Sequence, residues 1–116
     1  MGIEREFLFS SDFPSISKRS ERVVELLQWS EASKYLCANG SFSYMQDDGV
    51  FPLKDVAVDF QNFVPKEYYQ VGSPQEFIPY LSVLDALMNL GPEGTVHLIA
   101  AGTESWSSWD EMCKNV

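Results

Sequence analysis

Hydrophobic and polar residues alternate in two segments of the chain, and such alternation is typical of β-strands with one buried face. The segments are residues 3–9, IEREFLF, and residues 56–63, VAVDFQNF. In the second segment, Val58 and Phe60 are expected to point toward a core and Asp59 toward solvent. We therefore predict a half-buried strand in each of the two segments.

Further strand signals lie in the middle of the chain and toward its end. Residues 41–46 and 50–53 flank the sequence Asp-Asp-Gly at 47–49, which favours a tight hairpin turn. Residues 95–101, TVHLIAA, are apolar on both faces. This pattern predicts a central strand that is covered on both sides.

The first predicted helix follows a serine-rich connection. It begins near Ser17 or Ser20, because either hydroxyl can cap the free N–H groups of a helix start. The helical pattern can extend to Cys37, and Asn39 and Gly40 would then end the helix. Alternatively, the helix breaks at Trp29 and Ser30 caps a separate second helix.

The second predicted helix has the best local start signal in the chain. Residues 73–76, Ser-Pro-Gln-Glu, combine a capping hydroxyl, a proline at the first helical position and a glutamate that reaches back to the cap. We predict a short first turn there and a main helix from about 79 to 90, which Gly91 and Pro92 end. The predicted apolar stripe consists of Phe77, Leu81, Leu84 and Met88, and the opposite side carries Ser82, Asp85 and Asn89.

A short helix from Ser107 or Ser108 completes the predicted order β-α-β-β-β-α-β-α. This order predicts the α+β class, with one mixed or antiparallel sheet of about four to five strands and two to three helices packed on it. The 116 residues are close to the commonest domain size, and neither a linker nor a repeat interrupts them. We therefore expect a single domain over residues 1–116.

The chain is strongly acidic, with a formal net charge of −9. Residues 1–35 hold six acidic and five basic side chains, whereas residues 36–116 hold eleven acidic and three basic ones. The second segment therefore contributes −8 of the −9. A field of this sign repels nucleic acid and anionic lipid, and it attracts basic protein surfaces. It also keeps a small protein in solution whatever its function.

Targeting and redox signals favour the cytoplasm. The N-terminus lacks a basic region followed by an apolar run, and no apolar run approaches the ~18 residues of a membrane span. Cys37 and Cys113 are the only cysteines, and their number is typical of reduced intracellular thiols. A single disulfide between them remains an alternative at this point.

The sequence contains none of the familiar motifs of catalysis. No nucleophile elbow, Walker loop or dinucleotide fingerprint occurs. The lone His97 lies in the most apolar predicted strand, where a core or edge histidine is more frequent than a catalytic base. Neither a zinc set nor an EF-hand loop can be assembled. We therefore expect a protein that is not an enzyme and that holds no cofactor and no metal.

Two segments, residues 66–69 and residues 104–111, are the centre of the predicted partner-binding site. Tyrosine and tryptophan supply anchoring area at interfaces, and the carboxylates around them select a basic partner. Since Trp106 and Trp109 are three apart in the predicted C-terminal helix, we expect them to share a face and to be both buried or both exposed. The predicted contacts are Asp47, Asp48, Asp55, Asp59, Glu67, Tyr68, Tyr69, Glu104, Trp106, Trp109, Asp110 and Glu111.

Two short fragments carry a resemblance to a known class. Residues 65–69, Pro-Lys-Glu-Tyr-Tyr, and residues 84–87, Leu-Asp-Ala-Leu, are similar to fragments of barstar-type inhibitors. More broadly, the acidic α+β chain resembles small bacterial immunity proteins, which neutralise a cognate nuclease toxin. The two fragments lie further apart than in the barstar-type family, and the predicted hairpin has no counterpart there. The resemblance therefore implies the class of function and no particular fold.

These observations together predict an acidic inhibitor that binds a basic protein, in its most specific form an immunity protein that occludes the active site of a nuclease-type toxin domain. Nucleic acid and membrane are not expected as partners. One alternative is a phage-type nucleic-acid mimic that inhibits a host enzyme. Others are an acidic secretion chaperone, which requires an exposed apolar surface, and an unrecognised small enzyme.

Overall fold

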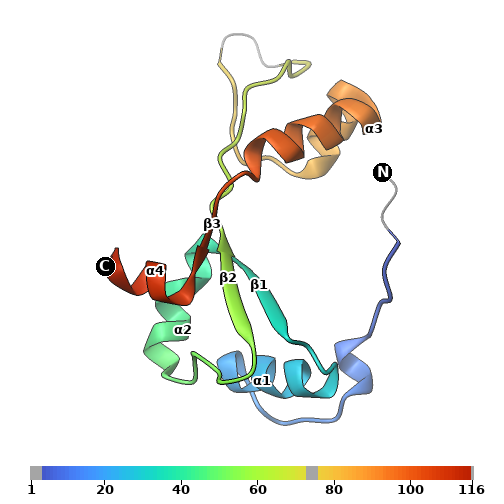
Figure 1. Cartoon of the computed structure of the whole chain (residues 1–116). Coiled ribbons are helices and arrows are strands. Elements are labelled where there is room, and N and C mark those ends of the chain that lie inside the picture. The colour runs from blue at the N-terminus through green and yellow to red at the C-terminus, as the bar shows by residue number, and fades with distance from the viewer. Residues whose placement is uncertain (1–3, 73–75, 116) are drawn as a thin grey trace. The chain divides into compact units, whose positions relative to one another are not determined.

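The computed structural model describes residues 4–72 and 76–115, and their contacts divide into two compact units. The sheet unit comprises residues 4–62 and 106–115, and the α3 unit comprises residues 63–105. Figure 1 shows the sheet with its helices, and the long helix α3 with the loops that flank it. Because the two units cohere separately, each is described by itself.

The sheet unit contains three strands and three α-helices. Strand β2 is central, since β1 pairs with it in parallel and β3 pairs with it antiparallel. Together with α3, Val83–Gly102, the chain is of the α+β class with one mixed sheet, as predicted, although the strands are fewer than expected. The elements of the sheet unit are α1 Arg19–Trp29, β1 Lys34–Ala38, α2 Phe42–Asp48, β2 Ala57–Gln61, β3 Trp106–Ser108 and α4 Trp109–Lys114, with 3-10 turns at Ser10–Asp12 and Asn39–Ser41.

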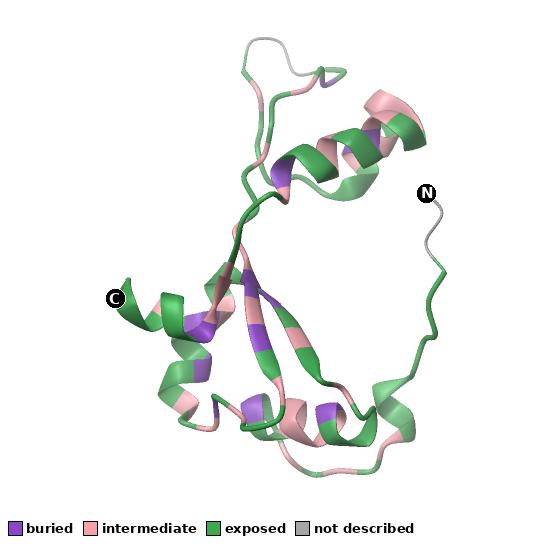
Figure 2. Ribbon diagram, in the orientation of Figure 1, coloured by how far each residue is buried: buried purple, intermediate pink, exposed green. Residues whose placement is uncertain are grey.

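The core of the sheet unit is aromatic. Phe60 of β2 is completely buried and packs edge-on against Phe42 of α2, with ring centroids 5.6 Å apart. Trp109 of α4 lies 5.1 Å from the Phe42 ring and 6.0 Å from the Phe60 ring. Burial along β2 alternates, with Val58 and Phe60 buried (Figure 2), which confirms the strand predicted from residues 56–63.

The predicted first strand is wrong. Residues 4–9 form neither strand nor helix and are exposed, and Phe7 is 79% accessible. Ile3 lies outside the described residues. Alternation shows only that a segment is amphipathic. A strand also needs a neighbour for its backbone N–H and C=O groups, and no described strand pairs with this segment.

The predicted hairpin over residues 41–53 is also wrong. Phe42 and Met45 are both buried, and their spacing of three places them on one face of α2. Gly49 follows this helix in the left-handed conformation, with φ 65°, as is common after helix ends. The Asp-Asp-Gly sequence therefore ends a helix instead of making a two-residue turn.

The first helix ends earlier than its longest predicted extent. Helix α1 stops at Trp29, and residues 34–38 form β1, in which Tyr35 and Cys37 are turned toward the core. The predicted break at Trp29 is confirmed, whereas the second helix capped by Ser30 is wrong. Neither Ser17 nor Ser20 caps α1, because Lys18 holds the cap position without a side-chain hydrogen bond.

The predicted strand at 95–101 is helical instead. Helix α3 breaks at Gly91, with φ 71° and ψ 177°, and a second helical segment begins at Pro92 and ends at Gly102. A short run that is apolar all round fits a covered strand and a helix equally well, and Pro92 in the first helical position decides for the helix. The main helix begins at Val83 rather than near 79, with Ser82 as its cap. Residues 73–75 of the predicted start signal lie outside the described residues.

Ser108 caps α4 in a capping box with Glu111, which confirms the predicted C-terminal helix. Among residues 4–72 and 76–115, no helix combines the length and apolar character needed to cross a membrane.

One acidic side chain joins the first two helices. Asp48, at the end of α2, accepts hydrogen bonds from the Arg19 guanidinium and from the hydroxyl of the buried Ser20, the latter at 2.7 Å. These two bonds lower the pKa of Asp48 below its ordinary value of 3.8. The contact stabilises the folded chain only while the carboxylate is ionised.

Replacing the central aromatic residue should destabilise the sheet unit strongly. We expect Phe60→Ala to lower the free energy of unfolding by about 3–5 kcal/mol, because the cavity left between Phe42 and Trp109 cannot close. Phe7→Ala is the matched control and should cost less than about 0.5 kcal/mol, since that ring is exposed. Urea unfolding followed by tryptophan fluorescence measures both, and similar unfolding midpoints would contradict this description of the core.

The contribution of Asp48 should depend on pH with a definite sign. Because its pKa is lowered on folding, the stabilisation is present above its ordinary pKa of 3.8 and is lost as the pH falls through the lower, folded-state value. We expect Asp48→Asn to lower the urea midpoint at pH 7 and to differ progressively less from the unsubstituted chain below about pH 4. Asp47→Asn, at the exposed neighbouring position, should match the unsubstituted chain at both pH values, and a pH-independent deficit for Asp48→Asn would refute the linkage.

Candidate functional site

The predicted acidic contacts are divided between the two units. Glu67 and Glu104 belong to the α3 unit, and the other six belong to the sheet unit. Three of those six already have partners inside the fold: Asp48 binds Arg19, Asp59 binds Lys34 at 2.7 Å, and Glu111 caps α4. Those that remain exposed in the sheet unit are Asp47, Asp55 and Asp110. Asp55 precedes β2 instead of lying on it beside Asp59.

The two tryptophans do not share an environment. Trp109 is buried in the aromatic core, whereas Trp106 is 43% accessible in β3. The expectation that both would be buried or both exposed is therefore wrong. The spacing argument assumed one helix, but the chain passes from strand to helix between Ser108 and Trp109. Trp109 is a core residue and is not available to a partner.

The two tyrosines of the 64–72 loop differ as well. Tyr69 is exposed, whereas Tyr68 is half-buried and its hydroxyl donates a hydrogen bond to Asp85 Oδ2 at 2.5 Å. Burial and this carboxylate together raise the pKa of the Tyr68 phenol. Residues 64–72 form neither helix nor strand.

A polar network holds this loop against α3. Asp85 also accepts a hydrogen bond from Gln70, and Asn89, one turn further, accepts one from the backbone N–H of Val71 at 2.7 Å. The buried Gln70 amide donates to the Ile78 carbonyl and accepts from the Ile78 N–H, each at 3.0 Å. The side of α3 that was predicted to face water is therefore the side that packs against the loop.

The start of the loop is fixed at the other end of α3. The Val64 N–H donates to the Gly102 carbonyl at 3.0 Å. A Cβ at Gly102 would lie 2.4 Å from the Phe63 ring and 2.9 Å from the Val64 carbonyl oxygen, so only glycine permits this approach. With both ends of the loop held, its side chains and those of α3 enclose a space.

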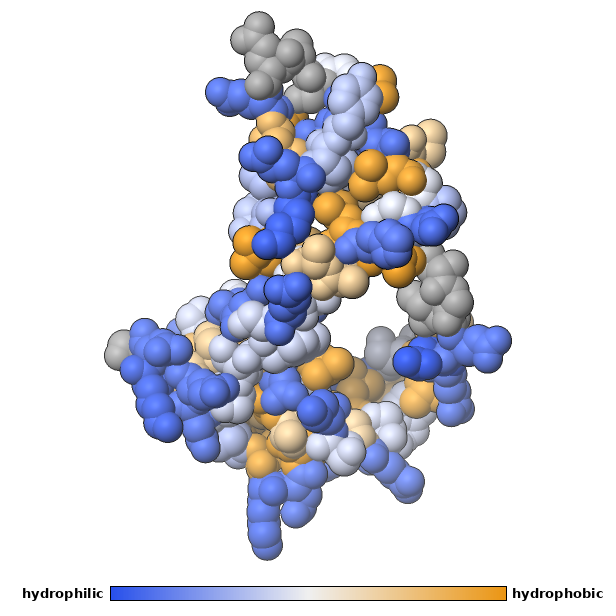
Figure 3. All heavy atoms as spheres, turned by 45° about the horizontal axis from the view of Figure 1, so that its top comes forward, coloured by the Kyte–Doolittle hydropathy of each residue, from blue (hydrophilic) through white to orange (hydrophobic). Residues whose placement is uncertain are grey.

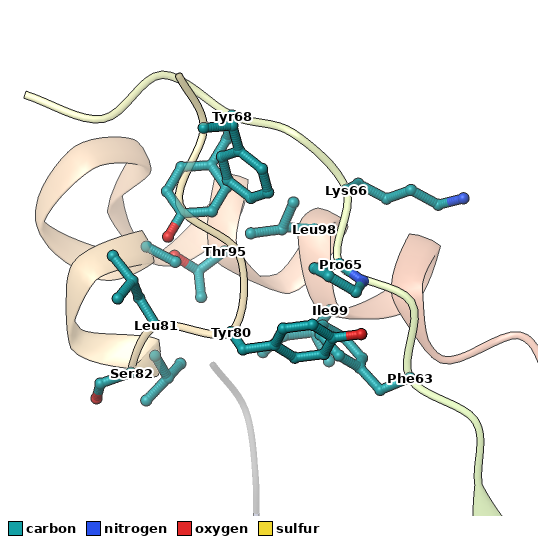
Figure 4. Close-up of a pocket in the computed structure, with 13 residues that line it drawn as sticks. Phe63, Pro65, Lys66, Tyr68, Tyr80, Leu81, Ser82, Thr95, Leu98 and Ile99 are labelled. Atoms are coloured by element: carbon teal, nitrogen blue, oxygen red, sulfur yellow. The ribbon is translucent and has the colours of Figure 1, made fainter. Parts of the chain in front are cut away.

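That space is an apolar cavity of about 160 Å³ within the α3 unit. In Figure 4 the Tyr80 side chain reaches from the segment before α3 toward Phe63 and Pro65 on the facing segment. Two lining residues, Ala86 and Thr95, are buried, and the Thr95 hydroxyl donates to the Gly91 carbonyl. The lining residues are Phe63, Pro65, Lys66, Tyr68, Phe77, Tyr80, Leu81, Ser82, Val83, Ala86, Thr95, Leu98 and Ile99.

Polar groups are few at this cavity. The Lys66 ammonium and the Tyr80 hydroxyl have no hydrogen-bonding or ion-pair partner among the described residues. Figure 4 shows the Lys66 side chain extending away from the cavity. The interior is therefore suited to an apolar group and not to a charged one.

The α3 unit leaves much of its apolar surface accessible. Its described buried residues are small or polar: Gln70, Ala86, Thr95 and Gly102. Hydrophobic residues, orange in Figure 3, lie at the molecular surface among charged ones. The exposed large hydrophobic residues of this unit are Phe63, Val64, Tyr69, Val71, Ile78, Tyr80, Leu81, Val83, Leu84, Met88 and Val96.

The predicted apolar stripe of the helix contributes to this surface. Leu84 and Met88 are four residues apart on α3, so they share a face, and Met88 is 87% accessible. Leu81, which lines the cavity, is also exposed. The sequence reveals the stripe, but it does not reveal that the polar side, with Asp85 and Asn89, is the packed one.

The remaining chemistry-bearing residues are not assembled into a centre. His97 is exposed on α3, which corrects the expectation of a core or edge histidine in a strand. Cys37 is buried and Cys113 exposed, and both are free thiols, so the alternative of a disulfide does not hold. In the part of the chain that the structure describes, no group of His, Cys, Asp or Glu could hold a metal ion.

Comparisons with known proteins give one relationship. A search of curated proteins finds no match, and neither does a search of solved structures. The model of the WbqC-like protein family matches residues 1–97. That match covers most of both the sheet unit and the α3 unit. The chain belongs to the WbqC-like protein family.

Proposed function

We propose that the chain is an acidic protein-binding protein whose α3 unit carries the docking surface. The observation that carries this proposal is the exposed apolar surface of that unit, where eleven of the described large hydrophobic residues are accessible. Large exposed apolar surface is a frequent mark of interaction sites. The two tyrosines of the loop lie in the same unit, and exposed aromatic rings are frequent anchors at interfaces.

Charge indicates which partner fits this surface. Residues 63–105 contain five acidic side chains and one basic one, Lys66, which gives −4 with histidine neutral. Of the five, Asp85 is engaged with Tyr68, while Glu67, Glu93 and Glu104 are exposed. A basic partner would be drawn to such a surface by long-range attraction, and its association would slow as salt rises.

The more specific form of the proposal is an immunity protein that inhibits a basic nuclease-type toxin. It is supported by the acidic charge and by the two barstar-like fragments, residues 65–69 and 84–87. Both fragments lie in the α3 unit, and the hydrogen bond from Tyr68 to Asp85 joins them. This form stays a prediction, as does the resemblance on which it rests.

A secretion chaperone is the second candidate, and one observation favours it. Such a chaperone needs an exposed apolar surface, which the α3 unit has. It is also expected to be a dimer that holds an unfolded client, whereas an inhibitor binds a folded partner. Sedimentation equilibrium distinguishes the two, since a monomer at all concentrations argues against the chaperone.

A photo-crosslinking experiment tests the proposal. A benzophenone amino acid placed at Met88 should give a discrete adduct in the source cell, and one placed at Ile16 should not. Both side chains are apolar and exposed, and Ile16, 99% accessible, lies in the sheet unit. In extracts, adduct formation should fall as the salt concentration rises, because attraction between opposite charges is screened.

The crosslinked partner and one further variant make the experiment decisive. Mass spectrometry should identify a partner with a net positive charge. Leu84→Glu should reduce the adduct about tenfold or more, because a carboxylate replaces an apolar contact, whereas Ile16→Glu should leave it unchanged. No adduct, equal adducts from both positions, or an acidic partner would refute the proposed docking surface.

A further inference from the structure

The cavity of the α3 unit lies within the surface proposed above to bind a partner. Tyr80, Leu81 and Val83 line the cavity and are also exposed. Their side chains therefore belong both to the cavity wall and to the outer apolar surface. A partner that covered the surface would also cover the opening of the cavity.

The size of the cavity selects the kind of group that enters it. Its volume is about 160 Å³, whereas sites for whole small-molecule ligands span roughly 300–1,000 Å³. An apolar cavity of ~150 Å³ holds a single six-membered ring. The space therefore fits one large side chain, and a free ligand of that size would leave Leu84 and Met88 uncovered.

We infer that this cavity receives one large apolar side chain, aromatic or branched, from the basic protein partner. The inference rests on the proposed function and names the anchor of that interaction. The walls are suited to it, since Phe77 and Tyr68 are already packed edge to face with ring centroids 5.3 Å apart, and an incoming ring can add to such an arrangement. Anchors buried in pockets of this kind supply most of the binding energy at many interfaces.

Charge argues against a second copy of this chain as the occupant. Each copy has a net charge of −9, and residues 63–105 contribute −4 of it. Bringing two such surfaces together places like charges at close range, which opposes association. A partner segment that carries lysine or arginine beside its apolar anchor would instead be attracted, because Glu67 and Glu104 are exposed in the same unit.

The first test uses the purified chain and three side-chain analogues: toluene, p-cresol and 3-methylindole. We expect at least one of them to bind saturably and to shift the NMR methyl signals of Ala86, Leu98 and Ile99, which line the cavity. Ala86→Leu fills the space from a buried wall position and should abolish this binding. Ala100→Leu is the matched control, since it makes the same change at an exposed position of α3, and it should bind normally.

The second test asks whether the partner uses the cavity. In the crosslinking experiment at Met88, Ala86→Leu should reduce the adduct about tenfold or more, while Ala100→Leu should not. Val83→Phe, which fills the cavity from its exposed rim, gives the same test if Ala86→Leu lowers the melting temperature. The analogue that binds best should compete with adduct formation.

The outcomes separate this inference from the proposed function. An adduct that persists unchanged in both filled variants would overturn the anchor and leave the docking surface standing. Analogue binding without any effect of filling on the adduct would show a cavity for free small molecules and would also overturn the anchor. If no analogue binds saturably, the cavity accepts no such group and the inference fails. Absence of any adduct would count against the proposed function, and analogue binding would then still report on the cavity alone.

Discussion

The hydrogen bond between Tyr68 and Asp85 decides which side of α3 is turned inward. Together with the contacts of Gln70 and Asn89, it ties residues 68–71 to the polar side of the helix. A helix normally packs its apolar side and shows its polar side to water. Here the polar side is satisfied by the loop, so Leu84 and Met88 remain at the surface. The apolar side of α3 is therefore accessible, and it forms part of the surface proposed above to bind a partner.

The two units show two different ways of holding a chain together. In the sheet unit, aromatic packing around Phe60 does most of the stabilising, and acidic side chains such as Asp48 and Asp59 act locally, each with one cation. In the α3 unit, hydrogen bonds to side chains take the place of a large apolar core. Such networks specify one arrangement when all their members are satisfied. Because these hydrogen bonds hold the loop on α3, many apolar side chains of the unit stay exposed.

The sequence correctly predicted the elements whose local pattern is compatible with only one kind of secondary structure. The alternation of Val58 and Phe60 required a strand beside a core, and the serine and glutamate of the capping box required a helix after Ser108. Predictions were wrong where a pattern is compatible with more than one structure. Residues 4–9 alternate, but no strand in the described part of the chain pairs with them. Residues 95–101 are apolar enough for either a strand or a helix. The first segment is not a strand because no described strand pairs with it, and the second is a helix because Pro92 starts one. Pairing between segments that are distant in the chain cannot be predicted from a short sequence pattern.

The candidate site was predictable only in part, for the same reason. The sequence singled out Tyr68 and Tyr69, and the structure shows that Tyr68 binds Asp85 while Tyr69 is exposed. Asp85 was predicted to lie on the solvent side of its helix, because periodicity identifies a polar stripe without showing what covers it. The acidic side chains likewise fall into two kinds, those with partners inside the fold and those that are exposed. Asp48, Asp59 and Glu111 have partners within the fold, whereas Glu67 and Glu104 are exposed in the unit that also exposes many hydrophobic residues. In such a pairing the two properties do different work: the charge selects and attracts a basic partner over a distance, and the apolar surface supplies contact energy once that partner has arrived. A surface with charge alone would attract a basic partner but bind it weakly, and an apolar surface alone would bind without selecting among partners. The α3 unit has both exposed carboxylates and exposed hydrophobic residues.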